Sequence, residues 1–329
     1  MPGKGGVFVF MEQTDGVLED ASLEVLGKGR EIADRLGVTL TGAILGEGVG
    51  GLAEQCARRG AHVVLVGDSP LLKDFTAEAY TDVVAGMVRS IDPDMLLIGA
   101  THNGTALAGM LAVRLGTGLM AHVVDLEIET GTGMLLGSVP GFGGSIVAVC
   151  KCKKGRPQMA TVRPGVFTAP APTEQTGKVE PFPLELKPED VRCQVVERQV
   201  QRGVSVSKAQ RVVVAGLGCK DDLSLPKKLA EATASAFGVS RPLADKGMAP
   251  KNLVVGSTGS SLNAKLVVVV GVSGAAHFTS GLRNAETVVA VNSDPNAEIF
   301  KHADYCVVGD ATKVVPRLIS ELGASGGGA

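Results

Sequence analysis

The chain has 329 residues, of which 45% are hydrophobic and 20% are charged, and its formal net charge at pH 7 is −2. This much apolar sequence can build the cores of two domains of ordinary size, and it excludes a chain that is disordered throughout. A nucleic-acid partner is not expected, because basic residues are not in excess and only 3% of the residues are aromatic.

The first half of the chain alternates strand-like and helix-like segments. Short, continuously apolar runs are typical of parallel strands that are buried on both faces, and the periodic segments between them are long enough for helices. The predicted strands are 7–11, 39–45, 62–67 and 95–99, and the predicted helices are 21–36, 51–59, 76–91 and 105–115. We therefore expect βαβ units and a parallel sheet that is covered on both sides.

The pattern changes after Gly116. The runs 122–128, 134–139, 145–151 and 159–163 predict short strands, arranged as hairpins or as an antiparallel extension of the same sheet. Six prolines between residues 164 and 188 then predict an irregular connector. We expect the boundary near residue 200, with an N-terminal domain at 1–200 and a C-terminal domain at 201–329.

The second half resumes the α/β pattern. Its predicted strands are 211–215, 253–255, 265–270, 287–291 and 305–308, and its predicted helices are 225–237 and 313–322, with helical turns from Ala275 and at 296–301. The fold class is therefore α/β, with two tandem parallel-sheet domains. Doubly wound sheets bind ligands beyond the carboxyl ends of their strands, so residues at those positions are candidates for a site.

Targeting and metal-binding signals are weak. No apolar run approaches the roughly 20 residues that a membrane span needs, and the opening MPGKGGVFVFMEQTDG is typical of a first strand rather than a signal peptide. We expect a cytoplasmic protein whose six cysteines are free thiols. The pair Cys150 and Cys152 lacks further ligands at metal-binding spacing, so no metal site is expected.

The turn Gly271-Val272-Ser273-Gly274 follows a run of four valines. As a nucleophile elbow it lacks the last glycine, because Ala275 stands there, and His277 follows too soon to be the usual base of a triad. As the opening of a helix, the same turn exposes backbone N–H groups, a hydroxyl and the positive end of a helix dipole, which suits a phosphate. A second glycine pair, Gly216 and Gly218, fails as a dinucleotide fingerprint because Asp221 replaces the third glycine.

Polar residues recur at five consecutive strand ends of the second domain. Each of them alone is explained by turn formation or helix capping. Together they predict a pocket for a large polar cofactor. They are Ser240 with Arg241, the run Val255-Gly256-Ser257-Thr258-Gly259, the turn Gly271 to Gly274, Asn292 with Asp294, and Asp310.

With these residues in place, the sequence resembles the alpha subunit of electron transfer flavoprotein. The most specific match is RPQMATVRPGVF at 156–167, and further matches include VGSTG at 255–259, GVSGA at 271–275 and HADYCVVGDATKVVP at 302–316. The resemblance covers almost the whole chain. It implies a heterodimer with a beta subunit and one FAD in a Rossmann-like C-terminal domain. It further implies electrons from flavin-dependent dehydrogenases, such as the acyl-CoA dehydrogenases of fatty acid beta-oxidation, and a quinone reductase or another redox partner as acceptor.

The resemblance also implies cofactor-binding roles, with no catalytic residue of the chain's own. Arg241 is expected over the flavin ring, and Thr258 near its reactive edge. The ring and phosphate region is expected to contact Ser273, Gly274, Ala275, Ala276 and His277. Asn292 is assigned to the ribityl–adenosine part, and Asp310 with Ala311 to the adenine end.

Two departures from the family pattern are expected to matter. Leu217 takes the place of an arginine, and Lys220 is a candidate for the lost cation. Phe278 stands where the family usually has a histidine facing the flavin's pyrimidine carbonyl, and His277 lies one place earlier. These changes predict a divergent member with a lowered flavin potential, unless His277 substitutes. The alternatives are an alpha subunit of an electron-bifurcating flavoprotein, a flavin-less scaffold with a decayed site, and a hydrolase that acts through Ser273.

Overall fold

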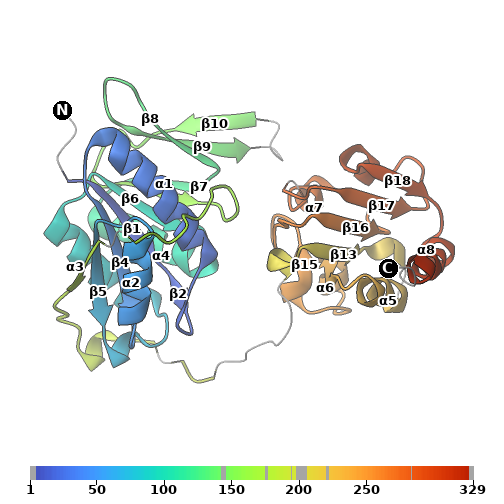
Figure 1. Cartoon of the computed structure of the whole chain (residues 1–329), viewed down its shortest axis with the longest axis horizontal. Helices are drawn as coiled ribbons and strands as arrows, with labels where there is room; N and C mark the ends of the chain where they lie inside the picture. Colours follow the sequence, from blue (N-terminus) through green and yellow to red (C-terminus); the bar gives the residue numbers. More distant parts are fainter. Residues whose placement is uncertain are drawn as a thin grey trace. The chain divides into compact units, whose positions relative to one another are not determined.

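The computed structural model describes residues 5–141, 146–174, 177–193, 195–197, 206–219, 222–282 and 284–325. Internal contacts divide the chain into two compact units, Met1–Arg198 and Gln199–Ala329. Each unit is an α/β structure built on a parallel sheet (Figure 1). The predicted fold class is therefore confirmed.

The N-terminal unit contains a seven-stranded parallel sheet in the order β12-β5-β4-β1-β6-β11-β7. Its strands are β1 (Val7–Met11), β4 (Leu40–Gly46), β5 (Val63–Asp68), β6 (Met95–Gly99), β7 (Leu119–Val123), β11 (Gln158–Val162) and β12 (Lys178–Pro181). Its helices are α1 (Asp20–Leu36), α2 (Gly50–Arg58), α3 (Ala77–Ile91) and α4 (His102–Leu115). A short hairpin, β2 (Gln13–Thr14) with β3 (Val17–Leu18), follows β1.

The two faces of this sheet bury separate apolar clusters. Alternate residues of a strand point to opposite faces. Val7 and Val9 therefore pack with α1 and α2, whereas Phe8 and Phe10 pack with α3 and α4. Because both faces are covered, all five residues of β1 are buried, which explains why the strand is continuously apolar in sequence.

The segment after α4 differs from the prediction in its pairing. β7 and β11 join the main sheet in parallel, and only β8 (Asp125–Ile128), β9 (Leu135–Gly141) and β10 (Ile146–Cys150) form antiparallel pairs, in a three-stranded sheet of their own. The proline-rich connector is also not wholly irregular, because β12 adds to β5 at the sheet edge. An edge position tolerates the proline that ends β12, since one side of that strand needs no donor.

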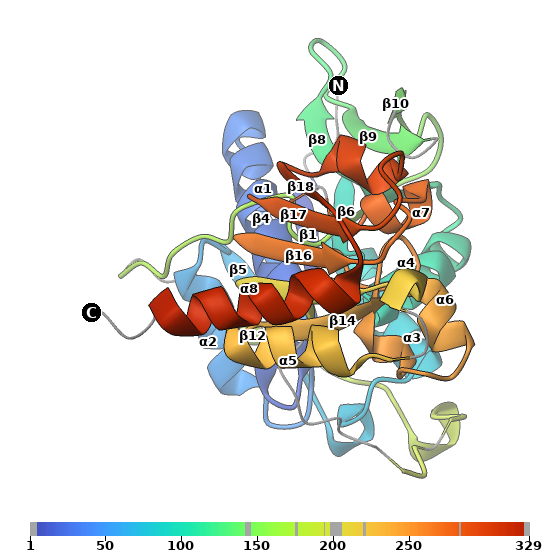
Figure 2. The ribbon, with the colours of Figure 1, turned by 90° about the vertical axis from the view of Figure 1, so that its right-hand side faces the viewer.

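The C-terminal unit contains a six-stranded parallel sheet in the order β15-β14-β13-β16-β17-β18. Its strands are β13 (Arg211–Ala215), β14 (Ala236–Ser240), β15 (Val254–Val255), β16 (Leu266–Val270), β17 (Val288–Asn292) and β18 (Tyr305–Val308). Its helices are α5 (Ser224–Ala232), α6 (Arg241–Asp245), α7 (Ala276–Thr279) and α8 (Ala311–Ser325), with 3-10 turns η5 (Leu217–Cys219) and η7 (Glu298–His302). Figure 2 shows α5 and α8 side by side on one face of this sheet, where they bury Val213 and Val270.

The prediction of a helix over 225–237 is wrong at its end. The helix ends at Ala232, and β14 occupies residues 236–240. Between the helix and the strand, Ala234 adopts a positive φ of 48°. This backbone conformation is usually found at glycine or asparagine. No glycine or proline therefore marks this helix end in the sequence.

Candidate functional site

The order in which strands are added to the C-terminal sheet reverses between β13 and β16. From β13 the chain proceeds to β14 and β15 on one side, and from β16 it proceeds to β17 and β18 on the other. The carboxyl ends of the two strands at such a switch point flank the crevice in which doubly wound sheets bind ligands. A cavity of about 840 Å³ lies there, within the range of ~300–1,000 Å³ that is usual for ligand pockets.

Most of the predicted site residues line this cavity. They are Ser240, Arg241, Val255, Thr258, Gly271, Ser273, Ala275, His277, Phe278, Asn292 and Asp294. Gly256, Ser257, Gly274 and Ala276 are not among its lining residues, but they belong to the two loops that form its wall. Val272 of the predicted turn and Leu217 also line it. Further lining residues were not predicted as cofactor contacts, namely Gly218, Pro242, Asp245, Asn296, Ala297 and Glu298.

The glycine pair after β13, Gly216 and Gly218, allows this loop to pack closely against the backbone of the loop after β16. Gly218 donates its N–H to the carbonyl oxygen of Gly271 at 2.8 Å, and a Cβ on Gly218 would lie 2.8 Å from the Gly271 Cα. Gly216 approaches the same carbonyl too closely for any side chain. The loops after β13 and β16 can therefore touch only because both are glycine at this point, which explains the pair without a dinucleotide fingerprint.

The turn after β16 presents unpaired backbone donors. Gly271 and Gly274 have φ values of 66° and 94°, which turn the chain sharply before α7. Within the described part of the chain, the N–H groups of Ser273, Gly274 and Ala275 have no hydrogen-bond acceptor. α7 has four residues, so its dipole is small, and the donors themselves are what suit an anionic or carbonyl oxygen.

Arg241 begins α6, directly after β14. Its Nε atom lies 2.9 Å from Oδ1 of Asp245, one helical turn later, and both side chains are about half exposed (50% and 51%). An exposed pair of this kind contributes little to stability. The guanidinium can therefore exchange this partner for a ligand oxygen at small cost.

Two hydrogen bonds connect the loop after β15 to α7. The Ser257 N–H donates to the His277 carbonyl at 2.7 Å, and Ser257 Oγ lies 3.1 Å from His277 Nδ1. Among the described residues, no carboxylate is bonded to the other ring nitrogen of His277, so the third member of a hydrolytic triad is missing. Within the described ranges, no hydrogen bond joins the Ser273 side chain to His277, and the hydrolase alternative gains no support.

His277 and Phe278 have different environments. The His277 side chain is exposed on the cavity wall, whereas Phe278 is 6% exposed and packs in the apolar cluster around Val267 and Ile299. Phe278 is therefore mostly enclosed by the core, although it is among the lining residues. Of these two neighbours, His277 is the exposed one.

Residues at and directly after the end of β17 also line the cavity. Asn292 Nδ2 donates to the Val272 carbonyl at 2.8 Å, which fixes the turn after β16 from the next strand. Asp294 then accepts the N–H of Asn296 at 2.9 Å through Oδ1, so this chain segment folds back along the cavity. These contacts bring Asn296 and Glu298 into the lining.

Asp310 and Ala311 lie at the start of α8 and are not among the residues that line the cavity. Asp310 Oδ1 accepts the Thr312 N–H at 2.8 Å, which is a helix-capping contact. Leu217 lines the cavity and is 44% exposed. The expected substitute for the lost cation, Lys220, lies outside the described residues.

Cys219 directly follows Gly218, which lines the cavity. Its Sγ donates to the Val270 carbonyl at 3.3 Å, and burial raises the pKa of the thiol. The group therefore stays a neutral thiol at neutral pH and adds no charge to the site.

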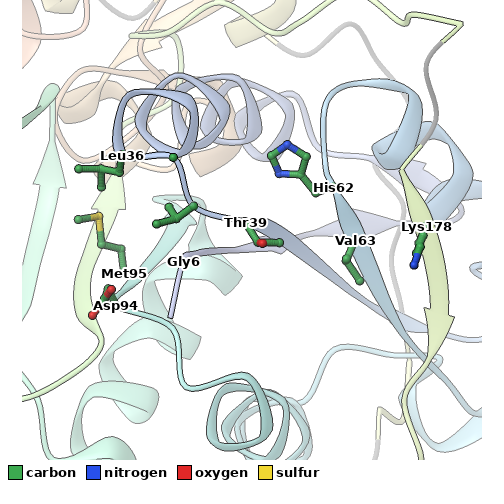
Figure 3. Close-up of a pocket in the computed structure, with 10 residues that line it drawn as sticks. Gly6, Leu36, Thr39, His62, Val63, Asp94, Met95 and Lys178 are labelled. Carbon is green, nitrogen blue, oxygen red and sulfur yellow. The ribbon is translucent and has the colours of Figure 1, made fainter. Parts of the chain in front are cut away.

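A second hollow, of about 850 Å³, lies in the N-terminal unit (Figure 3). Its lining residues Thr39, Val63, Met95 and Lys178 stand at the first positions of their strands or directly before them. This is the amino edge of the sheet, opposite the edge at which such sheets bind ligands. Size alone does not separate the two hollows, but position favours the one in the C-terminal unit.

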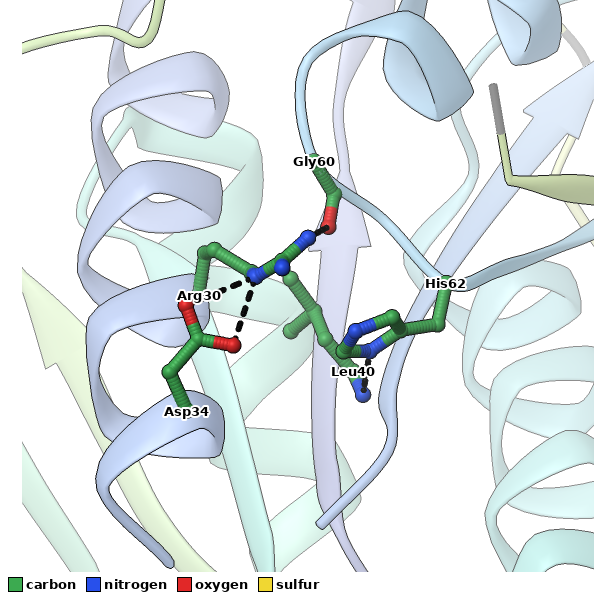
Figure 4. Close-up of polar contacts among 5 residues, drawn as sticks. All are labelled: Arg30, Asp34, Leu40, Gly60 and His62. Carbon is green, nitrogen blue, oxygen red and sulfur yellow. Dashed lines mark hydrogen bonds and ion pairs between the residues drawn. The ribbon is translucent and has the colours of Figure 1, made fainter. Parts of the chain in front are cut away.

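Side chains around this second hollow already have partners. His62 Nδ1 accepts the Leu40 N–H at 2.9 Å, and Arg30 bonds Asp34 at 2.8 Å and the Gly60 carbonyl at 3.0 Å (Figure 4). These bonds join α1 to the turn after α2. They give the residues a structural role.

The described residues contain neither a metal-binding cluster nor a membrane-spanning helix. Across the described ranges, no group of three or more His, Cys, Asp or Glu side chains is arranged to hold a metal ion. Cys150 and Cys152 are half-buried against the N-terminal core. In the same ranges, no helix is long and apolar enough to cross a membrane.

Comparison with known proteins identifies the family. Residues 7–186 match the family model described as "Electron transfer flavoprotein domain", and residues 205–283 match "Electron transfer flavoprotein FAD-binding domain". An electron transfer flavoprotein subunit alpha of Thermoanaerobacterium thermosaccharolyticum is 37% identical over 96% of this chain and 97% of its own length. The chain belongs to the electron transfer flavoprotein alpha subunit family.

Other relatives carry different names. Protein FixB of Clostridium saccharobutylicum is 38% identical over 96% of both chains. Subunit LctC of the lactate dehydrogenase (NAD(+),ferredoxin) of Acetobacterium woodii is 33% identical over 96% of this chain and 77% of its own length.

The cavity falls largely within the matched flavin-binding segment. Residues 205–283 contribute the ends of β13, β14, β15 and β16, while Asn292 to Glu298 complete the wall from beyond the segment. As an electron transfer flavoprotein alpha subunit, the chain has the family's flavin-binding domain in its C-terminal unit.

Proposed function

We propose that this chain is the FAD-carrying alpha subunit of a heterodimer with an electron transfer flavoprotein beta subunit. In this proposal it accepts electrons from flavin-dependent dehydrogenases, of which acyl-CoA dehydrogenases are one class, and passes them to a quinone reductase or another redox acceptor. The observation that supports it most directly is the cavity at the switch point of a domain that matches the FAD-binding model.

The residues around the cavity fit such a cofactor. The unpaired N–H groups of Ser273, Gly274 and Ala275 suit phosphate or ring carbonyl oxygens, and Arg241 supplies a fixed positive charge. The amide of Asn292 and the carboxylate of Asp294 suit the hydroxyls of a ribityl or ribose chain. Bound FAD would supply the capacity to take up and release electrons, which none of these side chains has.

The chain's own contribution would be to hold and tune the cofactor. Thr258 and the backbone of Val255, Gly256 and Ser257 would form one wall, with Gly271, Ala276 and His277 in the other. Phe278 would present an apolar edge. The assignment of Asp310 and Ala311 to the adenine end remains part of the proposal, although the cavity as described does not extend to them.

A second candidate function is an alpha subunit of an electron-bifurcating flavoprotein. The observation that favours it is the similarity to LctC, a subunit of a lactate dehydrogenase named for both NAD(+) and ferredoxin. Such a complex would need a further flavin, which we would assign to the partner subunit.

The test is to co-express the chain with an electron transfer flavoprotein beta subunit, release the flavin by denaturation and count it per heterodimer. One FAD supports the carrier. Two FAD support the bifurcating complex, for which reduction by NADH is the next measurement. No flavin after reconstitution with FAD would overturn both proposals and favour the scaffold alternative.

A further inference from the structure

We propose that the carboxylate of Glu298 lowers the redox potential of the bound flavin, and that the ion pair of Glu298 with Lys301 limits this effect. The inference rests on the proposed function, because it requires FAD in the cavity. It gives a role to two residues that were not predicted as cofactor contacts, and this role depends on their charges.

Backbone contacts hold Glu298 next to the turn after β16. Glu298 begins η7 and lines the cavity. The N–H of the next residue, Ile299, donates to the Ser273 carbonyl at 3.0 Å, and a Cβ on Gly274 would lie 2.7 Å from the carbonyl carbon of Glu298. Glu298 is therefore a close neighbour of the unpaired N–H groups that this turn offers to a ligand.

Charges are unevenly distributed around the cavity. Among the described lining residues, Arg241 is the one lysine or arginine, and it is paired with Asp245 of the same helix at 2.9 Å. The described lining residues after β17 include two carboxylates, Asp294 and Glu298, and neither lysine nor arginine. The part of the lining that follows β17 therefore has a net negative charge.

Lys301 partly balances Glu298 from outside the lining. Its Nζ atom lies 2.9 Å from Oε2 of Glu298, and both side chains are exposed. An exposed pair of this kind contributes little to stability. We therefore expect η7 to remain folded when either charge is removed.

Electron uptake brings a new charge into the cavity. One electron passes from a reduced flavin-dependent dehydrogenase to the bound flavin, so the dehydrogenase is oxidised and the flavin is reduced, and no bond of Glu298 or Lys301 is made or broken. A nearby carboxylate repels the added negative charge, whereas an ammonium group attracts it. Water and salt weaken both interactions, because both side chains are exposed.

The sign of the effect separates a role of charge from a structural role. If the pair only held η7 in place, loss of either partner would break the same ion pair and disturb the cavity in the same direction. If the charges act on the flavin, Glu298→Gln raises the potential and Lys301→Gln lowers it.

The experiment measures the one-electron midpoint potential of the FAD-loaded heterodimer at constant pH, at low and at high salt. Glu298→Gln should raise the potential by up to about 59 mV, which corresponds to a tenfold change in the equilibrium constant for uptake of one electron. Lys301→Gln should lower it, and the double variant should lie close to the wild type. These shifts should become smaller at high salt. Glu298→Asp keeps the charge and should remain near the wild-type potential.

The matched control is Glu286→Gln. Glu286 is exposed, precedes β17 at the amino edge of the same sheet and is not among the residues that line the cavity. Its loss of one negative charge should leave the potential unchanged.

Shifts of the same sign in Glu298→Gln and Lys301→Gln, at equal FAD content, would overturn the inference and leave the proposed function intact. An unchanged potential in Glu298→Gln would do the same. A wild-type heterodimer without FAD would overturn the proposed function instead. If Glu298→Gln does not retain FAD, Lys301→Gln decides alone: a lowered potential supports the inference, and an unchanged or raised one contradicts it.

Discussion

The backbone N–H of Ile299 donates a hydrogen bond of 3.0 Å to the carbonyl oxygen of Ser273, and this bond ties the turn after β16 to η7. The contact requires glycine at the next position. A Cβ on Gly274 would collide with the backbone nitrogen of Ile299, and Gly274 has a φ of 94°. Gly274→Ala should therefore push the turn and η7 apart and lower the FAD content of the purified heterodimer, measured by absorbance.

The matched control is Gly247→Ala. Gly247 also has a positive φ, 74°, but a Cβ there would meet nothing within 4 Å. Its cost should be limited to backbone strain of roughly 1–2 kcal/mol, with FAD content unchanged. Equal loss of FAD in the two variants would show that the close approach to Ile299 is not what matters.

Arg241 allows stability and cofactor binding to be separated. Its ion pair with Asp245 is half exposed, so Arg241→Ala should lower the free energy of unfolding by at most about 1 kcal/mol. If the guanidinium contacts the cofactor, the same variant should bind FAD at least tenfold more weakly, because a charge-assisted contact is lost. Titration of the flavin-free heterodimer with FAD, followed by fluorescence, measures this.

Asp245→Asn is the companion variant for Arg241. It removes the competing carboxylate and leaves the guanidinium available, so FAD should bind as tightly as in the wild type or more tightly. Weaker binding of FAD in Asp245→Asn than in the wild type would contradict this view of the pair.

Asp310 offers a test between capping and cofactor contact. Asp310→Ala removes the cap of α8 and should lower the free energy of unfolding by about 0.5–2 kcal/mol. Asp310→Ser keeps an N-cap oxygen and should restore most of this stability. If Asp310 also contacts the adenine end of FAD, both variants should weaken FAD binding; if capping is its whole role, neither should do so.

The sequence predicted the parts of the fold that continuous apolar runs specify. β1, β6 and β13 are buried on both faces, and their composition shows it. β14 was missed because Ala234 ends the preceding helix without a glycine. β12 was missed because it lies in a proline-rich segment, where an edge position is the exception.

The candidate site was predictable where residues directly follow strands. Ser240, Ser273 and Asn292 were found in this way, because parallel strands end at one edge of the sheet. Asp245 and Glu298 were missed, since they reach the cavity from a helical turn further along the chain. The spacing of four residues between Arg241 and Asp245 is a signal that could have suggested their pairing. The pairing of Ser257 with His277 joins loops from different strands, and sequence spacing carries no signal for it.

Glu12 makes the stability of the N-terminal unit depend on pH. It follows β1, is 6% exposed and accepts a hydrogen bond from the Thr101 hydroxyl, and burial raises its pKa above the ordinary value of 4.5. The folded state therefore binds the proton more tightly than the unfolded state, so the unfolding free energy falls as pH rises from the ordinary value through the raised one. Glu12→Gln cannot titrate, and its unfolding free energy relative to the wild type should rise across this window.

Glu129 should show a pH dependence of the opposite sign, because its hydrogen bond with Lys151 lowers its pKa. Relative to the wild type, Glu129→Gln should lose stability as pH rises through the window below 4.5. Urea unfolding followed by circular dichroism at a series of pH values measures both, and equal slopes for the two variants would contradict the assignment.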